Sequence, residues 1–214
     1  SSKNENIFWT HKDSGGESCI FAINQNGAHL GKYCLENVIA RDWEDIAISP
    51  NVSGNDYYIY IGDIGDNNSQ NDIKYIHRII EPTVSENQSP IIENINNVET
   101  FSYDYPNGNR DSETLMVDPN TLNIYIVSKR ENETSLYLLP FPQSTETINI
   151  ATYLGNFDMY PNQNQEENQL NWITAGDISM DGKEILIKSY IHIIHYARNY
   201  ETSIIESLQS PTEV

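Results

Sequence analysis

Acidic residues that could do chemistry occur in short clusters beside predicted strands. The sharpest cluster is Gly62-Asp63-Ile64-Gly65-Asp66-Asn67, where two carboxylates stand three residues apart and glycine permits a tight turn. Such oxygen ligands suit a hard cation, Ca²⁺ above all, although the 12-residue loop and closing glutamate of an EF-hand are absent. In the alternative interpretation, Asp63 and Asp66 cap turns by accepting hydrogen bonds from nearby backbone N–H groups.

Further carboxylates begin three predicted inner strands. Asp42-Trp43-Glu44-Asp45 begins the first, Asp111 and Glu113 the second, and Asp177 the third. The residues that we assign to a Ca²⁺ site are Asp42, Asp45, Asp63, Asp66 and Asp177. In the alternative, cationic side chains neutralise the carboxylates as internal ion pairs. The cations available for this are Lys12, Arg41, Arg110, Lys129 and Arg130.

One histidine stands near this acidic set. His11 lies two residues before Asp13 and could act as a general base with it. Together with Glu44 and Glu113, these residues form the candidate catalytic set of a cation-dependent hydrolase acting on phosphate or lactone groups. The sequence contains no G-x-S-x-G elbow, no H-E-x-x-H and no P-loop, so no nucleophile is assigned.

The elements that must position these residues are predicted to be strands. Short alternating runs such as Tyr57–Ile61 and Ile185–Tyr190 are rich in Tyr and Ile, and turn residues separate them. The runs recur in sets of up to four antiparallel strands, which predicts an all-β propeller. We place the blades at about residues 1–40, 41–108, 109–172 and 173–214, in a single domain.

The first predicted blade lacks its innermost strand, and the fourth ends with Thr202–Ser207 as its outer strand. About four blades with one strand missing leave exposed edges. We therefore expect further sequence or another chain to complete the ring. Two polar stretches, Asn87–Asn97 and Asn156–Asn171, are interpreted as loops.

The two cysteines are predicted to form a disulfide. Asn26-Gly27 is a strong hairpin signal, and a turn centred there pairs Ile23 with Leu30 and Cys19 with Cys34. Directly opposed strand residues lie within disulfide reach. A disulfide favours an oxidising compartment, whereas two buried free thiols in a cytosolic protein are the alternative.

Four N-x-S/T sequons also favour secretion, and all fall in predicted loops. They begin at Asn51, Asn67, Asn87 and Asn132, which are the predicted sites of N-linked glycans. The formal net charge of -19 disfavours nucleic acid and anionic membrane as partners. No apolar run approaches the roughly 20 residues that span a bilayer. The expected partners are other protein chains or copies of this one.

Five motifs resemble a family of secreted, mostly uncharacterised β-propellers broadly similar to NHL- and YVTN-type repeat proteins. They are Trp9–Gly15 (WTHKDSG), Asp42–Ala47 (DWEDIA), Tyr60–Asn67 (YIGDIGDN), Asp111–Pro119 (DSETLMVDP) and Thr174–Gly182 (TAGDISMDG). Lys12 and Thr114 depart from the family pattern of Asn and Ala. The resemblance implies the propeller fold more strongly than any activity.

The sequence therefore leads to two functional hypotheses. The first is an extracellular, glycosylated structural or protein-interaction module, stabilised by calcium and part of a larger assembly. The second is a cation-dependent hydrolase with an acidic active site on the channel face. We favour the first, because propellers host both roles and no nucleophile is evident.

Overall fold

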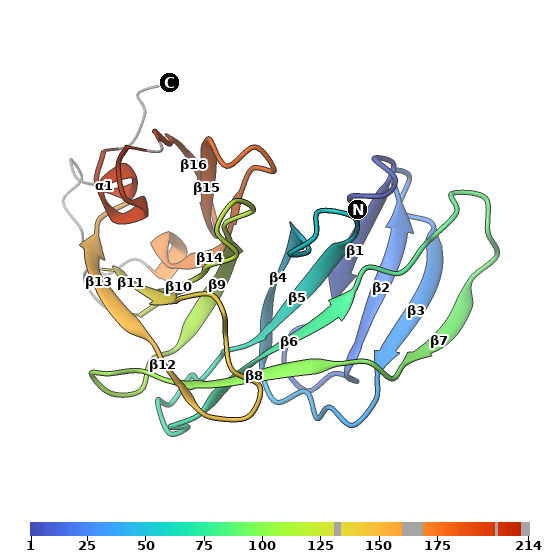
Figure 1. Cartoon of the computed structure of the whole chain (residues 1–214), viewed down its shortest axis with the longest axis horizontal. Coiled ribbons are helices and arrows are strands. Elements are labelled where there is room, and N and C mark those ends of the chain that lie inside the picture. Colours follow the sequence, from blue (N-terminus) through green and yellow to red (C-terminus); the bar gives the residue numbers. More distant parts are fainter. Residues whose placement is uncertain (131–133, 160–168, 200, 211–214) are drawn as a thin grey trace.

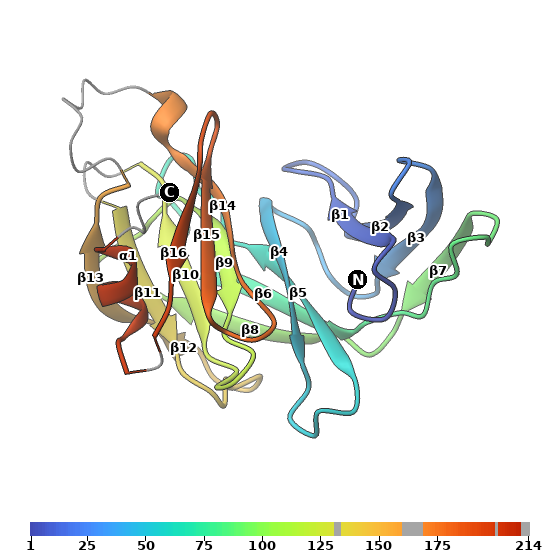
Figure 2. The same cartoon turned by 90° about the horizontal axis from the view of Figure 1, so that it is seen from above.

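The computed structural model describes residues 1–130, 134–159, 169–199 and 201–210. Four β-sheets follow one another along the chain, and Figure 1 shows sheets A, B and the pair C and D from one side of the molecule to the other. Seen from above in Figure 2, the sheets fan out with their broad faces toward one another. This radial stacking of mostly antiparallel sheets is the propeller-type, all-β fold that the sequence predicts.

The sheets have these members. Sheet A contains β1 (Ile7–His11), β2 (Cys19–Asn24), β3 (His29–Leu35) and β7 (Ile91–Ile95). Sheet B contains β4 (Trp43–Pro50), β5 (Tyr57–Asp63), β6 (Lys74–Ile80), β8 (Glu99–Asp104) and β12 (Asn149–Ile150). Sheet C contains β9 (Ser112–Val117), β10 (Ile124–Ser128), β11 (Thr134–Leu139) and β13 (Thr152–Phe157). Sheet D contains β14 (Ile173–Ile178), β15 (Glu184–Ser189) and β16 (Ile193–Ala197).

Each pair of neighbouring sheets encloses its own apolar core. Residues such as Ile20 and Ile59 join sheets A and B, Phe101 and Leu115 join B and C, and Val127 joins sheet C to D. The burial of side chains along a strand follows from this stacking: it alternates where only one face of the sheet is covered, and it is continuous where both faces are covered. In β15 every second side chain is buried, whereas all five side chains of β10 are buried between two neighbouring sheets. The inner strands β4, β9 and β14 contact one another where the sheets converge.

Two short strands, β7 and β12, join the preceding sheet instead of the sheet that contains the strands next to them in the chain. β7 lies inside the predicted loop Asn87–Asn97, so that prediction is wrong, and it pairs in parallel with β3 of the preceding sheet. β12 pairs in parallel with β8 in the same manner, while β13 provides the outer strand of sheet C. β7 lies between β6 and β8 of sheet B, and β12 lies between β11 and β13 of sheet C. Each of these connections therefore crosses to the preceding sheet and adds a strand to its outer edge.

The predicted outer strand Thr202–Ser207 is also wrong. The structure has a short helix there, α1 (Ile204–Leu208). A 3-10 turn, η1 (Gln169–Asn171), lies earlier in the chain, before β14. Ser203 caps α1, and Glu206 completes a capping box with it. α1 packs on β13, where Ile205 lies against Gly155.

The cysteine prediction is confirmed. Cys19 and Cys34 are directly paired in β2 and β3 and form a disulfide. A register shift after Ala22 pairs Ile23 with His29 instead of the expected Leu30. In the described residues, no helix is long and apolar enough to cross a membrane.

Candidate functional site on the channel face

Several loops and strand ends meet at one end of the inner strands. They are the β1–β2 connection, the beginnings of β4 and β9, and the connections after β5 and β10. Direct bonds join the segments of sheets B and C: Asp66 N–H donates to Asp111 Oδ1 (2.8 Å), and Arg130 contacts both Asp111 and Asn67. The β1–β2 connection of sheet A meets them through Asp13, which has a carboxylate oxygen within 4.8 Å of oxygens of Asp42 and Glu44. Residues from three predicted blades thus share one surface, which we call the rim.

Three carboxylates form the densest group on the rim. One oxygen each from Asp13, Asp42 and Glu44 lies within 4.8 Å of the others, and we call these residues the acidic trio. Gly65 packs against them, because a Cβ at position 65 would overlap carboxylate oxygens of Glu44 and Asp42. Position 65 therefore tolerates only glycine while these two carboxylates keep their places.

The electrostatics of the trio favour a bound proton or cation. Burial, followed by the neighbouring Glu113 and Asp42 carboxylates, raises the pKa of Glu44 to about 9. Burial and the nearby carboxylates of Asp111 and Asp13 likewise raise the pKa of Asp42. Carboxyl groups in this situation ionise together only when positive charge is supplied.

By contrast, Asp63 and Asp66 are used within the protein. Asp63 accepts hydrogen bonds from the N–H groups of Arg41 (3.2 Å) and Asp42 (2.7 Å). Asp66 accepts from the N–H groups of Gln70 and Asn71 and binds the Lys74 ammonium at 2.8 Å. Asp66 therefore matches the turn-capping alternative. The N–H donors to Asp63 lie 22 and 21 residues away in the chain, so Asp63 instead joins two separate segments.

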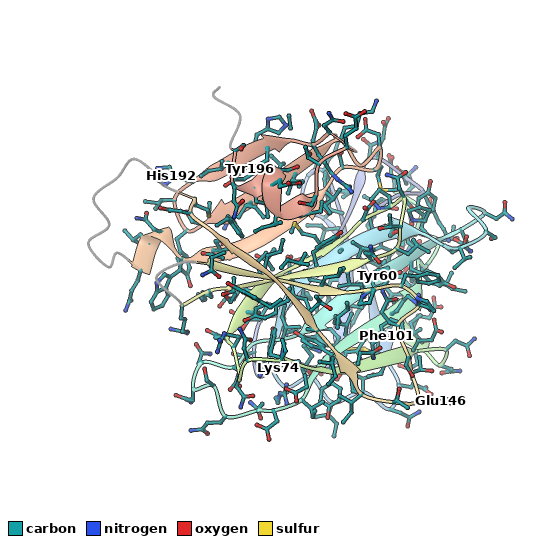
Figure 3. The ribbon with its side chains drawn as sticks, turned by 60° about the vertical axis from the view of Figure 1, so that its left-hand side comes forward. Tyr60, Lys74, Phe101, Glu146, His192 and Tyr196 are labelled. Carbon is teal, nitrogen blue, oxygen red and sulfur yellow. A yellow bond between two sulfur atoms is a disulfide. The ribbon has the colours of Figure 1, made fainter. Side chains whose placement is uncertain are left out.

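Lys74 is fully buried and labelled in Figure 3. Its Nζ also donates to the carbonyl oxygen of Asn71 at 2.6 Å and lies 5.9 Å from the centre of the Tyr105 ring. Burial alone would raise the pKa of Asp66, but the Lys74 bond and the backbone donors lower it. Lys74 and Asp66 thus form a satisfied internal ion pair.

The remaining rim carboxylates are also paired. Lys129 Nζ contacts Glu113 and donates to Tyr190 Oη at 3.1 Å. The Arg130 guanidinium pairs with Asp111 and lies 4.7 Å from the centre of the Trp172 ring. Within the described part of the rim, the carboxylates of the acidic trio form no ion pair, although the Arg41 charge acts to lower the pKa of Asp42.

Asp45 is positioned differently from the rest of the predicted calcium set. It is only 8% exposed, and its carboxylate accepts hydrogen bonds from the N–H groups of Leu115 (2.9 Å) in β9, Gly176 (3.4 Å) in β14 and Ile46 (2.9 Å). One side chain of β4 thereby links three inner strands. Burial raises the pKa of Asp45 to about 8, although the three N–H donors act in the opposite direction.

The other candidate residues are dispersed. Asp177 lies exposed on the outer face of sheet D, away from the trio's close grouping. The His11 ring packs edge-on against Trp43, with centroids 6.3 Å apart, and its Nδ1 lies 2.9 Å from the carbonyl oxygen of Lys12. Of the predicted calcium ligands, Asp42 belongs to the trio, which adds Asp13 and Glu44 from the predicted catalytic set.

Sequence reasoning missed three residues that shape the rim: Lys74, Trp172 and Tyr190. For Lys74, a signal exists, because a lysine begins a predicted strand only eight residues after an aspartate. For Trp172 and Tyr190, no local signal exists, since they reach Lys129 and Arg130 only through the packing of sheet D on sheet C.

The glycosylation candidates differ in their surroundings. Asn87 is exposed, whereas Asn51 accepts bonds from Ser53 and Asn55 within a turn. Asn67 contacts Arg130 on the rim, and Asn132 lies outside the described residues.

No family model and no curated protein matches this chain. The solved structures that it matches include a complex of KlAtg21 with the coiled-coil of AgAtg16, at 10% identity and a TM-score of 0.38. They also include the Dos1 propeller, at 11% identity and a TM-score of 0.36. Both matches cover 91% of this chain and about half of the other, at 50% and 52%. These TM-scores carry no argument about function.

The raised pKa values of Glu44 and Asp45 set the sign of the pH dependence. A carboxyl group whose folded pKa is raised stabilises the fold fully below its unfolded value of about 4 and loses that contribution as the pH rises through the folded value. In chelator, the free energy of unfolding should therefore fall between about pH 4 and pH 9.

Asp45→Asn should flatten this pH dependence, because its amide oxygen can accept the bonds from the Leu115 and Gly176 N–H groups without ionising, while the bond from Ile46 to the other oxygen is lost. Asp45→Ala should destabilise the protein by about 1–3 kcal/mol across the range, because it leaves buried N–H groups unpaired. Urea unfolding followed by circular dichroism at pH 5, 7 and 9 measures both effects. An identical pH dependence in wild type and Asp45→Asn would contradict the assigned role.

Proposed function

We propose that this chain is an extracellular, glycosylated protein-interaction module of propeller type that works within a larger assembly. The observation that carries the proposal is the apolar exposure of its two end sheets. Phe8 in sheet A is 50% exposed, and Leu186 and Ile193 in sheet D are 46% and 66% exposed. Sheet faces of this kind are covered by a neighbouring sheet elsewhere in the molecule.

The compartment is part of the proposal. The disulfide between Cys19 and Cys34 supports an oxidising environment, and the exposed Asn87 suits a glycan. The resemblance of the five motifs to secreted propellers of the NHL and YVTN type points the same way and stays a prediction.

Lysine cross-linking of the secreted protein tests the interaction proposal. Lys12 and Lys32 lie on the sheet A side and Lys188 on the sheet D side, so cross-links to any other polypeptide should concentrate at these positions. Lys3 pairs with Asp56 elsewhere and serves as the internal control. Intermolecular cross-links that are absent, or as frequent at Lys3, would contradict the proposal.

We further propose that a calcium ion stabilises the module at the acidic trio. Three carboxylate oxygens close together supply hard ligands, and a bound Ca²⁺ would replace the proton that the raised pKa of Glu44 retains. When no ion is bound, a protonated Glu44 would reduce the repulsion among the three carboxyl groups and so allow them to stay close together.

Calcium should therefore raise the thermal unfolding midpoint at pH 8, since a ligand at 100 times its Kd adds about 2.7 kcal/mol. Glu44→Gln should raise the midpoint in chelator, because it removes a carboxyl group that is costly to ionise, and should abolish the calcium response. Asp181→Asn, on an exposed turn of sheet D, is the matched control and should respond like wild type. An unchanged midpoint in saturating calcium would overturn the calcium site.

A cation-dependent hydrolase is the second candidate, favoured by the position of Glu44, whose pKa is raised to about 9, beside the carboxyl groups of Asp13 and Asp42. In that arrangement Glu44 would serve as general acid beside the cation, with His11 and Asp13 on the adjacent loop. The expected result is calcium-dependent hydrolysis of p-nitrophenyl phosphate that Glu44→Gln abolishes and Asp181→Asn retains. Equal rates for wild type and Glu44→Gln would remove this candidate.

A further inference from the structure

The outer face of sheet A is apolar with a basic margin. Phe8 pairs with Ile23, and Phe21 pairs with Lys32, so these four side chains share the face opposite the core with sheet B. Ile92 in β7, which is 77% exposed, pairs with Lys32 and extends the same face. Lys12 lies over the Phe21 ring at 5.9 Å, and Lys32 contacts Glu17. We call this surface the A face.

The outer face of sheet D is apolar, with the acidic side chains of Asp177 and Glu184 and the basic side chain of Lys188 around it. Leu186 pairs with Asp177, and Ile193 pairs with Lys188, on the side opposite the core with sheet C. Glu184 stands two residues before Leu186 in β15 and therefore shares this side, 3.6 Å from His195. We call this surface the D face.

The repeat makes these two faces complementary. Along the series from A to D, every sheet packs one face on the preceding sheet and the opposite face on the following sheet. In sheets B, C and D, the face equivalent to the A face is buried against the preceding sheet. In sheets A, B and C, the face equivalent to the D face is buried against the following sheet. A sheet A placed on a sheet D would therefore continue the packing already present three times in the chain.

From this we infer that two copies of the chain associate head to tail, with the A face of each packed on the D face of the other. This inference rests on the proposed interaction function and names its partner. In such a pair, Phe8, Phe21, Leu186 and Ile193 become buried, as the apolar side chains between neighbouring sheets already are within the chain. A heterologous contact made twice around a two-fold axis closes on itself. The closed pair holds eight sheets, within the range of four to eight blades found in propellers.

Static light scattering across a concentration series tests the inference on the intact chain. Wild type should give twice the monomer mass of 24.5 kDa. Phe8→Asp and Ile193→Asp, each alone, should give monomers, because every contact in the pair uses one A face and one D face. Ile148→Asp, on a side chain that is 53% exposed outside both faces, should remain a dimer. Circular dichroism and unfolding midpoints show that each variant is folded.

Mixing the two monomeric variants separates this geometry from a symmetric one. Phe8→Asp retains its D face and Ile193→Asp retains its A face, so an equimolar mixture should recover a dimer held by a single contact. If one variant alone stays dimeric, or the folded mixture stays monomeric, head-to-tail pairing is overturned. If wild type is a monomer at every concentration but cross-links to another polypeptide through Lys12, Lys32 or Lys188, the second copy is overturned and the interaction function stands. If wild type forms neither a dimer nor cross-links to another polypeptide, both the second copy and the interaction function are overturned.

Discussion

A single buried carboxyl group connects the inner strands on which the rest of the structure depends. Asp45 of β4 accepts N–H bonds from Leu115 of β9 and Gly176 of β14, and so ties sheets B, C and D where they converge. The carboxyl group of Asp45 thus provides a hydrogen-bond acceptor for one buried main-chain N–H group on each of the two neighbouring inner strands. The pKa of Asp45 is raised because a charged carboxylate at this buried position would lose its hydration.

That convergence also explains the rim. Because the inner strands begin at one end of the molecule, the acidic residues that start them are brought close to the loops after the second strands. The fold neutralises most of the resulting charge internally, through Lys74 on Asp66, Lys129 on Glu113 and Arg130 on Asp111. The acidic trio is the exception within the described rim, which is why the proposed cation is assigned there.

The sequence predicted the repeated antiparallel strands and the disulfide because both follow from local alternation and one hairpin turn. It predicted neither β7 nor the pairing of β12 with sheet B, because a parallel strand added to another blade's edge depends on a neighbour far away in the chain. The helix α1 was predictable in principle from Ser203 and Glu206, which have capping-box spacing. At the site, the sequence indicated which residues reach the rim but not their partners, since the grouping of Asp13 with Asp42 and Glu44 depends on how sheet A packs on sheet B.

The most direct test of this account is a titration of the Asp45 carboxyl carbon by ¹³C NMR, assigned by comparison with Asp45→Asn. We expect a midpoint near pH 8, with chemical-shift changes at the amide groups of Leu115 and Gly176 over the same range. A midpoint near the ordinary value of about 4 would contradict it. Asp45 would then be an ionised acceptor, and its burial would not set the pH dependence of the fold.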